Sequence, residues 1–220
     1  MAAAVDADPT PKSRRHAAGE DPRKRDQIIA GARAIFMDEG FDAASMNDIC
    51  RAAGVSKGTL YVYFASKEDL FVALVERERD RIFAAVDPLL ESDAPLPERL
   101  RLYARRFSEA VCSDEVIRAQ RIIIGIAERM PDLGARFVEG AIQRAHGRLA
   151  RFFERETAAG RLAVPDAEMA ASQFVELATA GLWRRRLFGK LAVPPPAAQV
   201  EAVAHAGVDL FLRAYGTGAA

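Results

Sequence analysis

Apolar residues recur at helical spacing through almost the whole chain. The first such stretch begins near Pro22 and ends before Gly40, and a glycine suits the left-handed cap that follows a helix. Its buried face is predicted to consist of Ile28, Ile29, Ala32, Ile35 and Phe36. The spacing therefore predicts one amphipathic helix between these two positions.

Two short helices follow, separated by a tight turn. Ser45 with Asp48 three residues later is a variant of the capping box, and Gly54 ends the helix that they begin. Ser56 caps the second short helix, whose inward face is predicted to carry Leu60 and Phe64, one turn apart. A short helix, a turn that contains glycine and a second short helix form the helix-turn-helix arrangement.

The rest of the chain has the same helical period. A fourth helix is predicted from Ser66 to Phe83, and ESDAPLPE is predicted to be a loop. Further helices are expected near residues 97–112, 114–129, 132–158, 166–188 and 197–215. We find no convincing strand pattern and no fixed-period repeat. The sequence therefore predicts an all-α protein.

Composition and charge limit the possible partners. The 220 residues are 50% hydrophobic, which is enough for a sizeable core. The 31 Lys and Arg residues balance 31 Asp and Glu residues, so any DNA must be met by a local patch. One candidate patch is a pair of basic clusters, Lys12, Arg14, Arg15 and Arg23, Lys24, Arg25. Runs of this kind are more often solvated arms.

The sequence gives no sign of export or membrane insertion. It has no uninterrupted apolar run of about 18 residues, and the start MAAAVDADPT lacks the regions of a signal peptide. Cys50 and Cys112 are far apart, which fits a reducing compartment and argues against a structural zinc site. We therefore expect a cytoplasmic protein without a membrane partner.

The second short helix mixes small, basic and aromatic residues. On a helical wheel Thr59, Val62 and Tyr63 point away from the buried face, and Tyr61 flanks it. The alternative is that both tyrosines pack against neighbouring helices with only their hydroxyls in water. A helix-turn-helix pattern alone also occurs in helical proteins that do not bind DNA.

The chemistry of this helix suits a phosphate backbone. Gly58 permits close approach, Lys57 supplies a flexible cation, and the Thr59 and tyrosine hydroxyls can donate to phosphate oxygens. The positive end of the helix dipole adds to this attraction. A protein without net charge can therefore still bind DNA through this helix.

These residues belong to a longer recognisable pattern. Its elements are Phe36, Gly40 and Phe41 at the end of the first helix, the turn over 52–56, the run Gly58-Thr59-Leu60-Tyr61, and then Phe64, Lys67 and Leu70. With them, the span 25–70 resembles the DNA-binding domain of the TetR family of bacterial transcriptional regulators. The resemblance implies that operator DNA is contacted by Ser45, Met46, Lys57, Gly58, Thr59, Tyr61, Tyr63 and Lys67.

The pattern departs from the family at a few positions. Gly31 and Cys50 stand where alanine is usual, and Val62 replaces a residue that is frequently polar. Gly31 inside a helix is expected to cost roughly 1 kcal/mol relative to alanine. Because Val62 has no polar group, the DNA base preference at this position is expected to differ from that of relatives with a polar residue there.

The resemblance also implies a division of the chain. We expect a disordered tail over residues 1–21, a TetR-type helix-turn-helix domain over 22–68 and a helical regulatory and dimerisation domain over 69–217. The C-terminal half, with SQFVELATAGLWRRRLFG, resembles the AefR-like branch more loosely. The partners implied are double-stranded operator DNA, a second copy of the chain and a small-molecule effector.

Two sets of residues are candidates for the regulatory sites. Small residues on the last two predicted helices favour a dimer interface made of Phe174, Leu177, Ala178, Gly181, Val203, Ala206 and Leu210. An apolar effector site is predicted from Tyr103, Phe107, Ile123, Met130, Phe137, Phe152, Phe174 and Trp183. Core packing within one chain is the alternative for both sets.

Catalytic and metal sites are not indicated. GVSKGT differs from a phosphate-binding loop because Lys57 precedes Gly58 in a helical context. The three histidines, His16, His146 and His205, are scattered, so no zinc or Ser-His-Asp site is predicted, and no cofactor is expected. The alternatives are a helical small-molecule-binding protein or enzyme without DNA affinity, and a helical scaffold. The preferred prediction is a dimeric repressor that an effector releases from a palindromic operator.

Overall fold

The computed structural model describes residues 19–218, apart from the side chains at positions 133, 136–138 and 141–145. Its elements are α1 (Pro22–Asp38), α2 (Met46–Ala53), α3 (Lys57–Tyr63), α4 (Lys67–Val86), the 3-10 helix η1 (Asp87–Glu91), α5 (Leu96–Val111), α6 (Asp114–Ala127), α7 (Pro131–Ala158), α8 (Ala167–Ala178), α9 (Trp183–Leu187) and α10 (Ala197–Tyr215). The only extended pairing within the described residues is an isolated bridge between Leu162 and Gly216. The predicted all-α class is confirmed.

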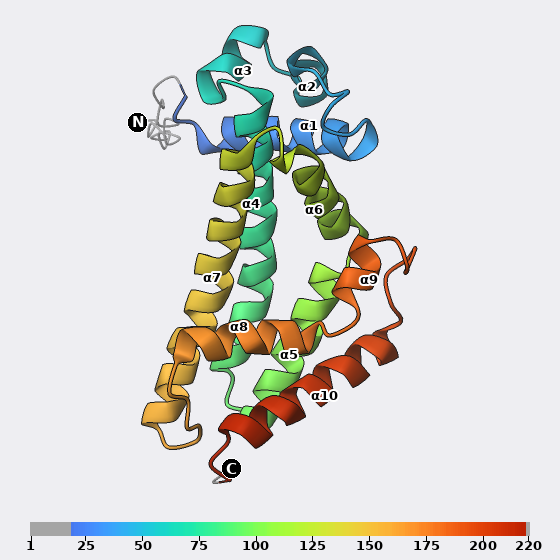
Figure 1. Ribbon diagram of the computed structural model, residues 1–220. Coiled ribbons are helices and arrows are strands. Elements are labelled where there is room, and N and C mark those ends of the chain that lie inside the picture. Colours follow the sequence, from blue (N-terminus) through green and yellow to red (C-terminus); the bar gives the residue numbers. More distant parts are fainter. Residues whose placement is uncertain (1–18, 219–220) are drawn as a thin grey trace, which may run out of the picture.

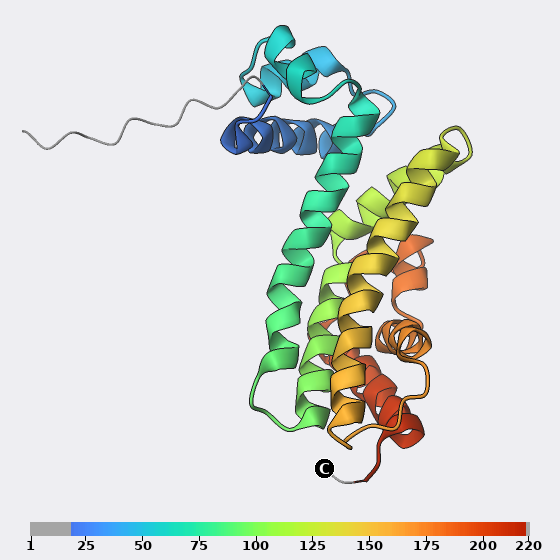
Figure 2. The same cartoon turned by 90° about the vertical axis from the view of Figure 1, so that its left-hand side faces the viewer.

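Helices α1, α2 and α3, with the first turns of α4, form a head at one end of the molecule, and α4 runs from this head into a longer helical body (Figure 1). Figure 2 shows α1 lying across the upper end of α4. Each of the head helices begins at a capped residue. Asp21, Ser45, Ser56 and Ser66 accept backbone N–H bonds at the starts of α1, α2, α3 and α4. The capping residues therefore set where these helices start.

The head has its own hydrophobic core. Three aromatic rings form its centre, and the Phe36, Phe41 and Phe71 ring centroids lie 5.2–5.6 Å apart. Around them lie the buried side chains of Ile28, Ile29, Ala32, Ala44, Ile49, Leu60, Phe64, Leu70 and Leu74. Because Leu70, Phe71 and Leu74 belong to α4, the head is packed onto the helix that leaves it.

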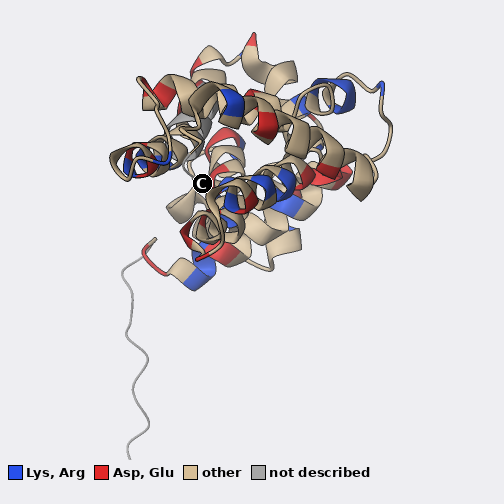
Figure 3. Cartoon of the chain, turned by 90° about the horizontal axis from the view of Figure 1, so that it is seen from below, with Lys and Arg blue, Asp and Glu red and all other residues tan. Residues whose placement is uncertain are grey.

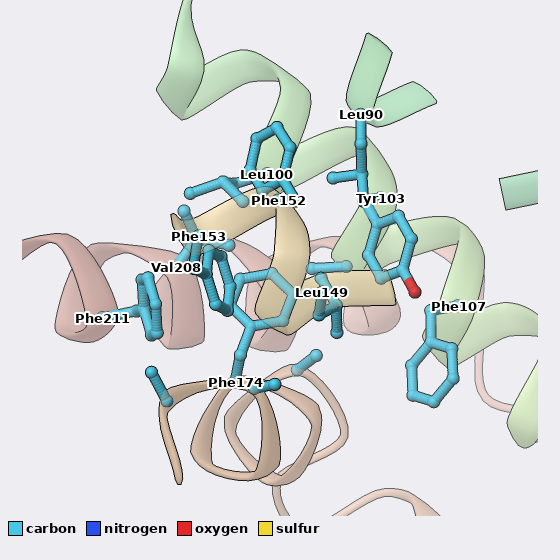
Figure 4. Packing of buried hydrophobic residues seen from close by; sticks show 14 of the residues in the cluster. Leu90, Leu100, Tyr103, Phe107, Leu149, Phe152, Phe153, Phe174, Val208 and Phe211 are labelled. Atoms are coloured by element: carbon cyan, nitrogen blue, oxygen red, sulfur yellow. The ribbon is translucent and has the colours of Figure 1, made fainter. Parts of the chain in front are cut away.

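The body is built around a second core. Helices α5, α7, α8 and α10 pack on one another, with α10 against α5 and α8. Figure 4 shows the phenylalanines from three of these helices meeting, and the Phe153 and Phe211 centroids are 4.8 Å apart. At the end of the body remote from the head, Lys and Arg lie among Asp and Glu along the helices (Figure 3). The charges of the body are therefore mixed in sign at this end.

Helix α6 connects the two parts. Ile123 and Ile126 on α6 are buried in the core of the head. Arg33 on α1 forms an ion pair with Glu115 on α6 at 2.6 Å, and Arg129 just after α6 contacts Asp42 at 2.9 Å. The apolar contacts and the ion pairs together hold α6 against the head.

The prediction of one continuous helix over 166–188 is wrong. The chain forms α8, then a turn, and then the short helix α9. Gly181 in the turn has φ +71°, a left-handed conformation that glycine adopts without strain. The turn brings Arg186 inward, where its guanidinium bonds the carbonyl oxygens of Cys112 and Leu191 at 3.0 and 2.9 Å. These buried hydrogen bonds favour the broken helix over a straight one.

Gly31 is placed where a side chain does not fit. It is buried on α1, and a methyl group at this position would lie 2.6 Å from the backbone nitrogen of Ala53 on α2. The two helices therefore approach backbone to backbone at this point. The helix propensity cost that the sequence predicts is offset by this close contact, so alanine is the worse residue here.

We predict that Gly31→Ala destabilises the protein by about 1–3 kcal/mol, because the added methyl group must push α2 away from α1. Gly125 is the matched control. It lies exposed in α6 with no atom within 4 Å of an added methyl group. Gly125→Ala should therefore stabilise by about 0.5–1 kcal/mol. Urea unfolding measures both, and equal effects of the two substitutions would contradict the packing argument.

Candidate nucleic-acid interface

Helix α3 is anchored from inside by two apolar side chains. Leu60 is fully buried, and Phe64, the residue that ends the helix, is nearly so. At the start of the helix, Ser56 Oγ accepts a hydrogen bond from the Thr59 backbone N–H at 3.1 Å. An isolated helix of this length is unstable in water, so it forms because the head holds its inner face. The opposite face is left in solvent.

The outer face of α3 presents an aromatic, an aliphatic and a basic side chain. Tyr61 is 46% exposed and Val62 is 54% exposed. The Lys57 ammonium is exposed and lies 5.9 Å from the centroid of the Tyr61 ring. Gly58, next to them, is also exposed. This surface combines a cation, a phenol and backbone that another molecule can approach closely.

Tyr63 differs from the expectation of the helical wheel. It is the more buried of the two tyrosines and packs against the core of the head, whereas Tyr61 points outward. The chain segment before α1 holds the Tyr63 hydroxyl through a hydrogen bond. The Asp21 backbone N–H donates to Tyr63 Oη at 3.3 Å. The hydroxyl hydrogen of Tyr63 remains available for donation to a phosphate.

The start of α2 lies in the same head. Ser45 caps this helix through the Asp48 N–H, and Met46 is half-buried against the core. Asn47 and Arg51, one turn apart on α2, are exposed on the side opposite the buried Ile49. The sequence analysis missed these two polar residues. Their spacing on the polar face of the helix was the signal that could have found them.

Lys67 has a structural task in the head. Its ammonium donates to the carbonyl oxygens of Phe41, Asp42 and Ala44 at 2.7, 3.1 and 3.0 Å. It also lies 4.6 Å from the centroid of the Phe41 ring. An ammonium group has three donors, and all three are used here. Lys67 therefore fastens the loop between α1 and α2 to the start of α4.

The residues predicted for the effector site fall into separate groups. Tyr103, Phe107, Phe152 and Phe174 lie together in the core of the body. Ile123 and Met130 pack instead against the core of the head. Trp183 on α9 is half-buried and donates to Gln120 on α6 at 2.7 Å. The side chain of Phe137 is outside the described set. The structure thus brings four of the eight residues together.

The residues predicted for the dimer interface also divide. Phe174 and Ala178 are buried in the core of their own protomer. Leu177 and Val203 are half-buried, and Gly181 and Ala206 are exposed. Leu210 on α10 is 49% exposed. The surface open to a second copy is therefore the outer side of α8 and α10, and the interface stays a prediction.

A head with two short capped helices, the second presenting its outer face to solvent, is a helix-turn-helix domain, here joined to a larger helical body. The comparisons with known proteins specify the family. Residues 28–74 match the family model of bacterial regulatory proteins of the tetR family. Residues 98–217, more than half of the chain, match the model of the C-terminal domain of AefR-like transcriptional repressors. The chain belongs to the TetR family of transcriptional regulators.

Solved structures resemble the chain over most of its length. A TetR-family regulator from Mesorhizobium loti is 30% identical with a TM-score of 0.80, and the alignment covers 90% of this chain and 99% of that one. The flavonoid-responsive regulator FrrA is 34% identical with a TM-score of 0.69 and the same two coverages. The resemblance therefore extends through both the head and the body.

Curated relatives match over shorter spans. The transcriptional activator FasR of Mycolicibacterium smegmatis is 34% identical over 91 residues, which are 41% of this chain and 42% of FasR. The regulator UidR of Escherichia coli is 43% identical over 60 residues, 27% of this chain and 31% of UidR. The chain thus matches less than half the length of these relatives. They are regulators, and none of their names describes an enzyme.

The described residues lack two further kinds of feature. They contain no group of three His, Cys, Asp or Glu side chains that could hold a metal ion. None of the described helices is long and apolar enough to cross a membrane.

Cys112 is buried and forms no disulfide. Burial raises the pKa of its thiol to about 11, although the nearby Arg186 acts to lower it. This thiol is therefore protonated at neutral pH.

We predict that Lys57→Ala weakens binding to every duplex and lowers the salt slope of log K by about one, because one phosphate contact is lost. The free energy of unfolding should not change, since Lys57 is exposed. Fluorescence anisotropy at several salt concentrations measures the slope. Lys190→Ala, an exposed lysine after α9, is the control. An unchanged slope for Lys57→Ala would remove this ammonium from the phosphates.

We predict that Lys67→Met acts mainly on stability. The substitution keeps the apolar stem but leaves three carbonyl oxygens without their donor, so the free energy of unfolding should fall by about 2 kcal/mol. Chemical unfolding and the salt slope of DNA binding are measured on the same sample. Native stability combined with a reduced slope would instead place the Lys67 ammonium at a phosphate.

Proposed function

We propose that this protein is a repressor that binds a near-palindromic operator as a homodimer in the cytoplasm and is released by a small, mostly apolar effector. The observation that carries the DNA-binding part is the exposed outer face of α3, with Lys57 and Tyr61 beside Gly58. We infer that this face enters the major groove. Ser45, Met46, Thr59 and Tyr63 complete the proposed set of operator contacts, and Asn47 and Arg51 extend it along α2. Lys67 supports this set from within the head, because its three donors are used by carbonyl oxygens there.

A dimer is supported by apolar side chains on the surface of the body. Leu210 on α10 and Met169 on α8 are 49% and 54% exposed, and Phe188 after α9 is 79% exposed. Exposed apolar side chains gain free energy when a second surface covers them. A two-fold dimer through α8 and α10 covers part of them and supplies two copies of α3 for half-sites about 34 Å apart.

We propose that the protein represses transcription, although its relatives include both activators and repressors. FasR is named a transcriptional activator, and KstR2 of Mycobacterium tuberculosis, 34% identical over 84 residues, a transcriptional repressor. The match of 98–217 to the AefR-like repressor domain favours repression. A dimer bound across a promoter then acts by excluding polymerase.

Helix α6 offers the route by which the body moves the head. It is held to the head near its start by the ion pair of Glu115 with Arg33, and near its end by the buried side chains of Ile123 and Ile126. Along its length, Arg121 donates to the carbonyl oxygens of Leu187 and Arg186 at 2.9 and 2.7 Å, which attaches it to α9. An effector that shifts α6 therefore changes the spacing of the two α3 helices. A differential affinity of about 1–3 kcal/mol is enough for a useful response.

The effector is proposed to be apolar for most of its surface. Four of the predicted contact residues form the aromatic core of the body. FrrA, which matches the chain over 90% of its length, is described as flavonoid-responsive. An aromatic effector for this chain agrees with both observations.

The test is a selection of bound duplexes from a random pool. We expect enrichment of an inverted repeat whose half-site centres lie about 10 base pairs apart or a multiple of this. Sedimentation of the complex should give an even number of protomers per duplex, with fewer retained when effector is added. If the protein selects no sequence even at low ionic strength, the remaining interpretation is a helical small-molecule-binding protein.

A further inference from the structure

Five buried side-chain atoms in the described part of the body lack a hydrogen-bond partner, and two of them are oxygen atoms of Tyr103 and Asp87. Within the described part of the chain, neither the Tyr103 hydroxyl nor Asp87 Oδ1 has a hydrogen-bond partner. Tyr103 is fully buried on α5, and Asp87 is the first residue of η1, directly after α4. Native proteins pair nearly all such atoms, because an unpaired buried group has lost its water without compensation. These two atoms therefore require a specific explanation.

Other buried polar groups of the body are paired to different degrees, and Thr157 Oγ1 near the end of α7 is also without a partner. Ser108, also fully buried on α5, donates to the carbonyl oxygen of Ala178 and lies at 2.7 Å from that of Ala104. Arg99 and Arg101 have an unpaired Nε each, but another nitrogen of each guanidinium forms an ion pair. The Tyr103 hydroxyl has no such second contact. Tyr103 is therefore a fully buried aromatic residue of this core whose only side-chain polar atom is unpaired.

The surroundings of Tyr103 are aromatic. Its ring lies nearly parallel to that of Phe107, with centroids 6.2 Å apart, and Phe107 stacks in turn on Phe83 at 6.4 Å. On the other side is Phe174, also at 6.2 Å. Figure 4 shows the hydroxyl pointing toward the Phe107 side and away from Phe152, Phe153 and Phe211. A ligand that reaches this hydroxyl would therefore contact aromatic rings, which favours a flat apolar ligand.

Asp87 supplies an unpaired acceptor whose charge acts on this donor. Its Oδ2 atom pairs with Arg148 Nε on α7 at 2.8 Å, which leaves Oδ1 free. Burial raises the pKa of Tyr103, and the negative charge of Asp87 raises it further, so the phenol stays a neutral donor at neutral pH. Burial also raises the pKa of Asp87, while Arg148 and Arg151 act to lower it. A neutral donor and a carboxylate acceptor are thus both buried and unpaired in the body.

We propose that Tyr103 and Asp87 bind a hydroxyl group of the effector, and that the effector is a neutral, hydroxyl-bearing aromatic molecule. A hydroxyl accepts the hydrogen bond of Tyr103 and donates its own hydrogen to Asp87 Oδ1, which satisfies both atoms at once. A hydrocarbon leaves both unpaired, and a carboxylate meets the charge of Asp87. The inference rests on the proposed function, since it names the chemical class of the proposed effector.

The experiment measures affinity for matched pairs of probes. Calorimetry with the full-length protein compares 2-naphthol with naphthalene and 7-hydroxyflavone with flavone, and 2-naphthoate serves as the charged probe. We expect at least one hydroxylated probe to bind ten times more tightly than its unsubstituted partner, and 2-naphthoate to bind more weakly than 2-naphthol. Equal affinities within both pairs, or binding of no probe, would overturn the proposal.

Two variants place the preference at these residues. Tyr103→Phe keeps the ring and removes only the unpaired hydroxyl, so the fold should persist, and the tenfold preference should disappear. Asp87→Asn should reduce the preference in the same direction. Tyr215→Phe is the control, because this hydroxyl lies on the surface and donates to Gln173 at 2.6 Å. A preference that survives in both Tyr103→Phe and Asp87→Asn would assign the pair to a trapped water, and the inference would be wrong.

Operator binding is measured separately, without any probe. If the protein selects no operator but keeps the Tyr103-dependent preference, the proposed regulation fails and the hydroxyl site stands. If the operator is bound but hydroxylated probes are not preferred, the proposed hydroxyl site is wrong and the proposed regulatory function remains. In the expected case, 7-hydroxyflavone or 2-naphthol releases the operator at concentrations at which Tyr103→Phe stays bound.

Discussion

The burial of Leu60 and Phe64 is the constraint on which the interface depends. Helix α3 is too short to persist by itself, so its orientation is set by the side chains that enter the core of the head. Once those two are inside, Tyr61 and Val62 must face solvent. The direct contact of α1 and α2 at Gly31 fixes the frame into which α3 packs.

The head is coupled to the body through α4 and α6. Helix α4 is continuous between them, whereas α6 is held by two buried isoleucines and by ion pairs at both ends of its contact with the head. The attachment of α6 to α9 depends on carbonyl oxygens at the end of α9. The head therefore has one connection to the body that is a continuous helix and another that consists of side-chain contacts.

The sequence predicts the helices of this fold well and their breaks less well. Capping serines and the glycine after α2 mark boundaries locally, so the expected starts of α2, α3 and α4 and the expected end of α2 agree with the structure, whereas α4 continues to Val86 beyond the predicted Phe83. The break between α8 and α9 is different. It depends on Arg186 reaching Cys112 and Asp114, which lie more than 70 residues away in the chain. No periodicity within residues 166–188 could show this.

For the site, the sequence by itself determined the composition of α3, the positions that face inward and the membership in the TetR family, because each of these depends on local spacing and local residue type. The tertiary structure alone decided that Tyr61 rather than Tyr63 is the outer tyrosine, that Lys67 binds three carbonyl oxygens, and that Tyr103 and Asp87 are buried without partners. The physical reason is that burial and hydrogen bonding depend on which distant segments meet. A one-dimensional pattern records only what a residue is suited to do.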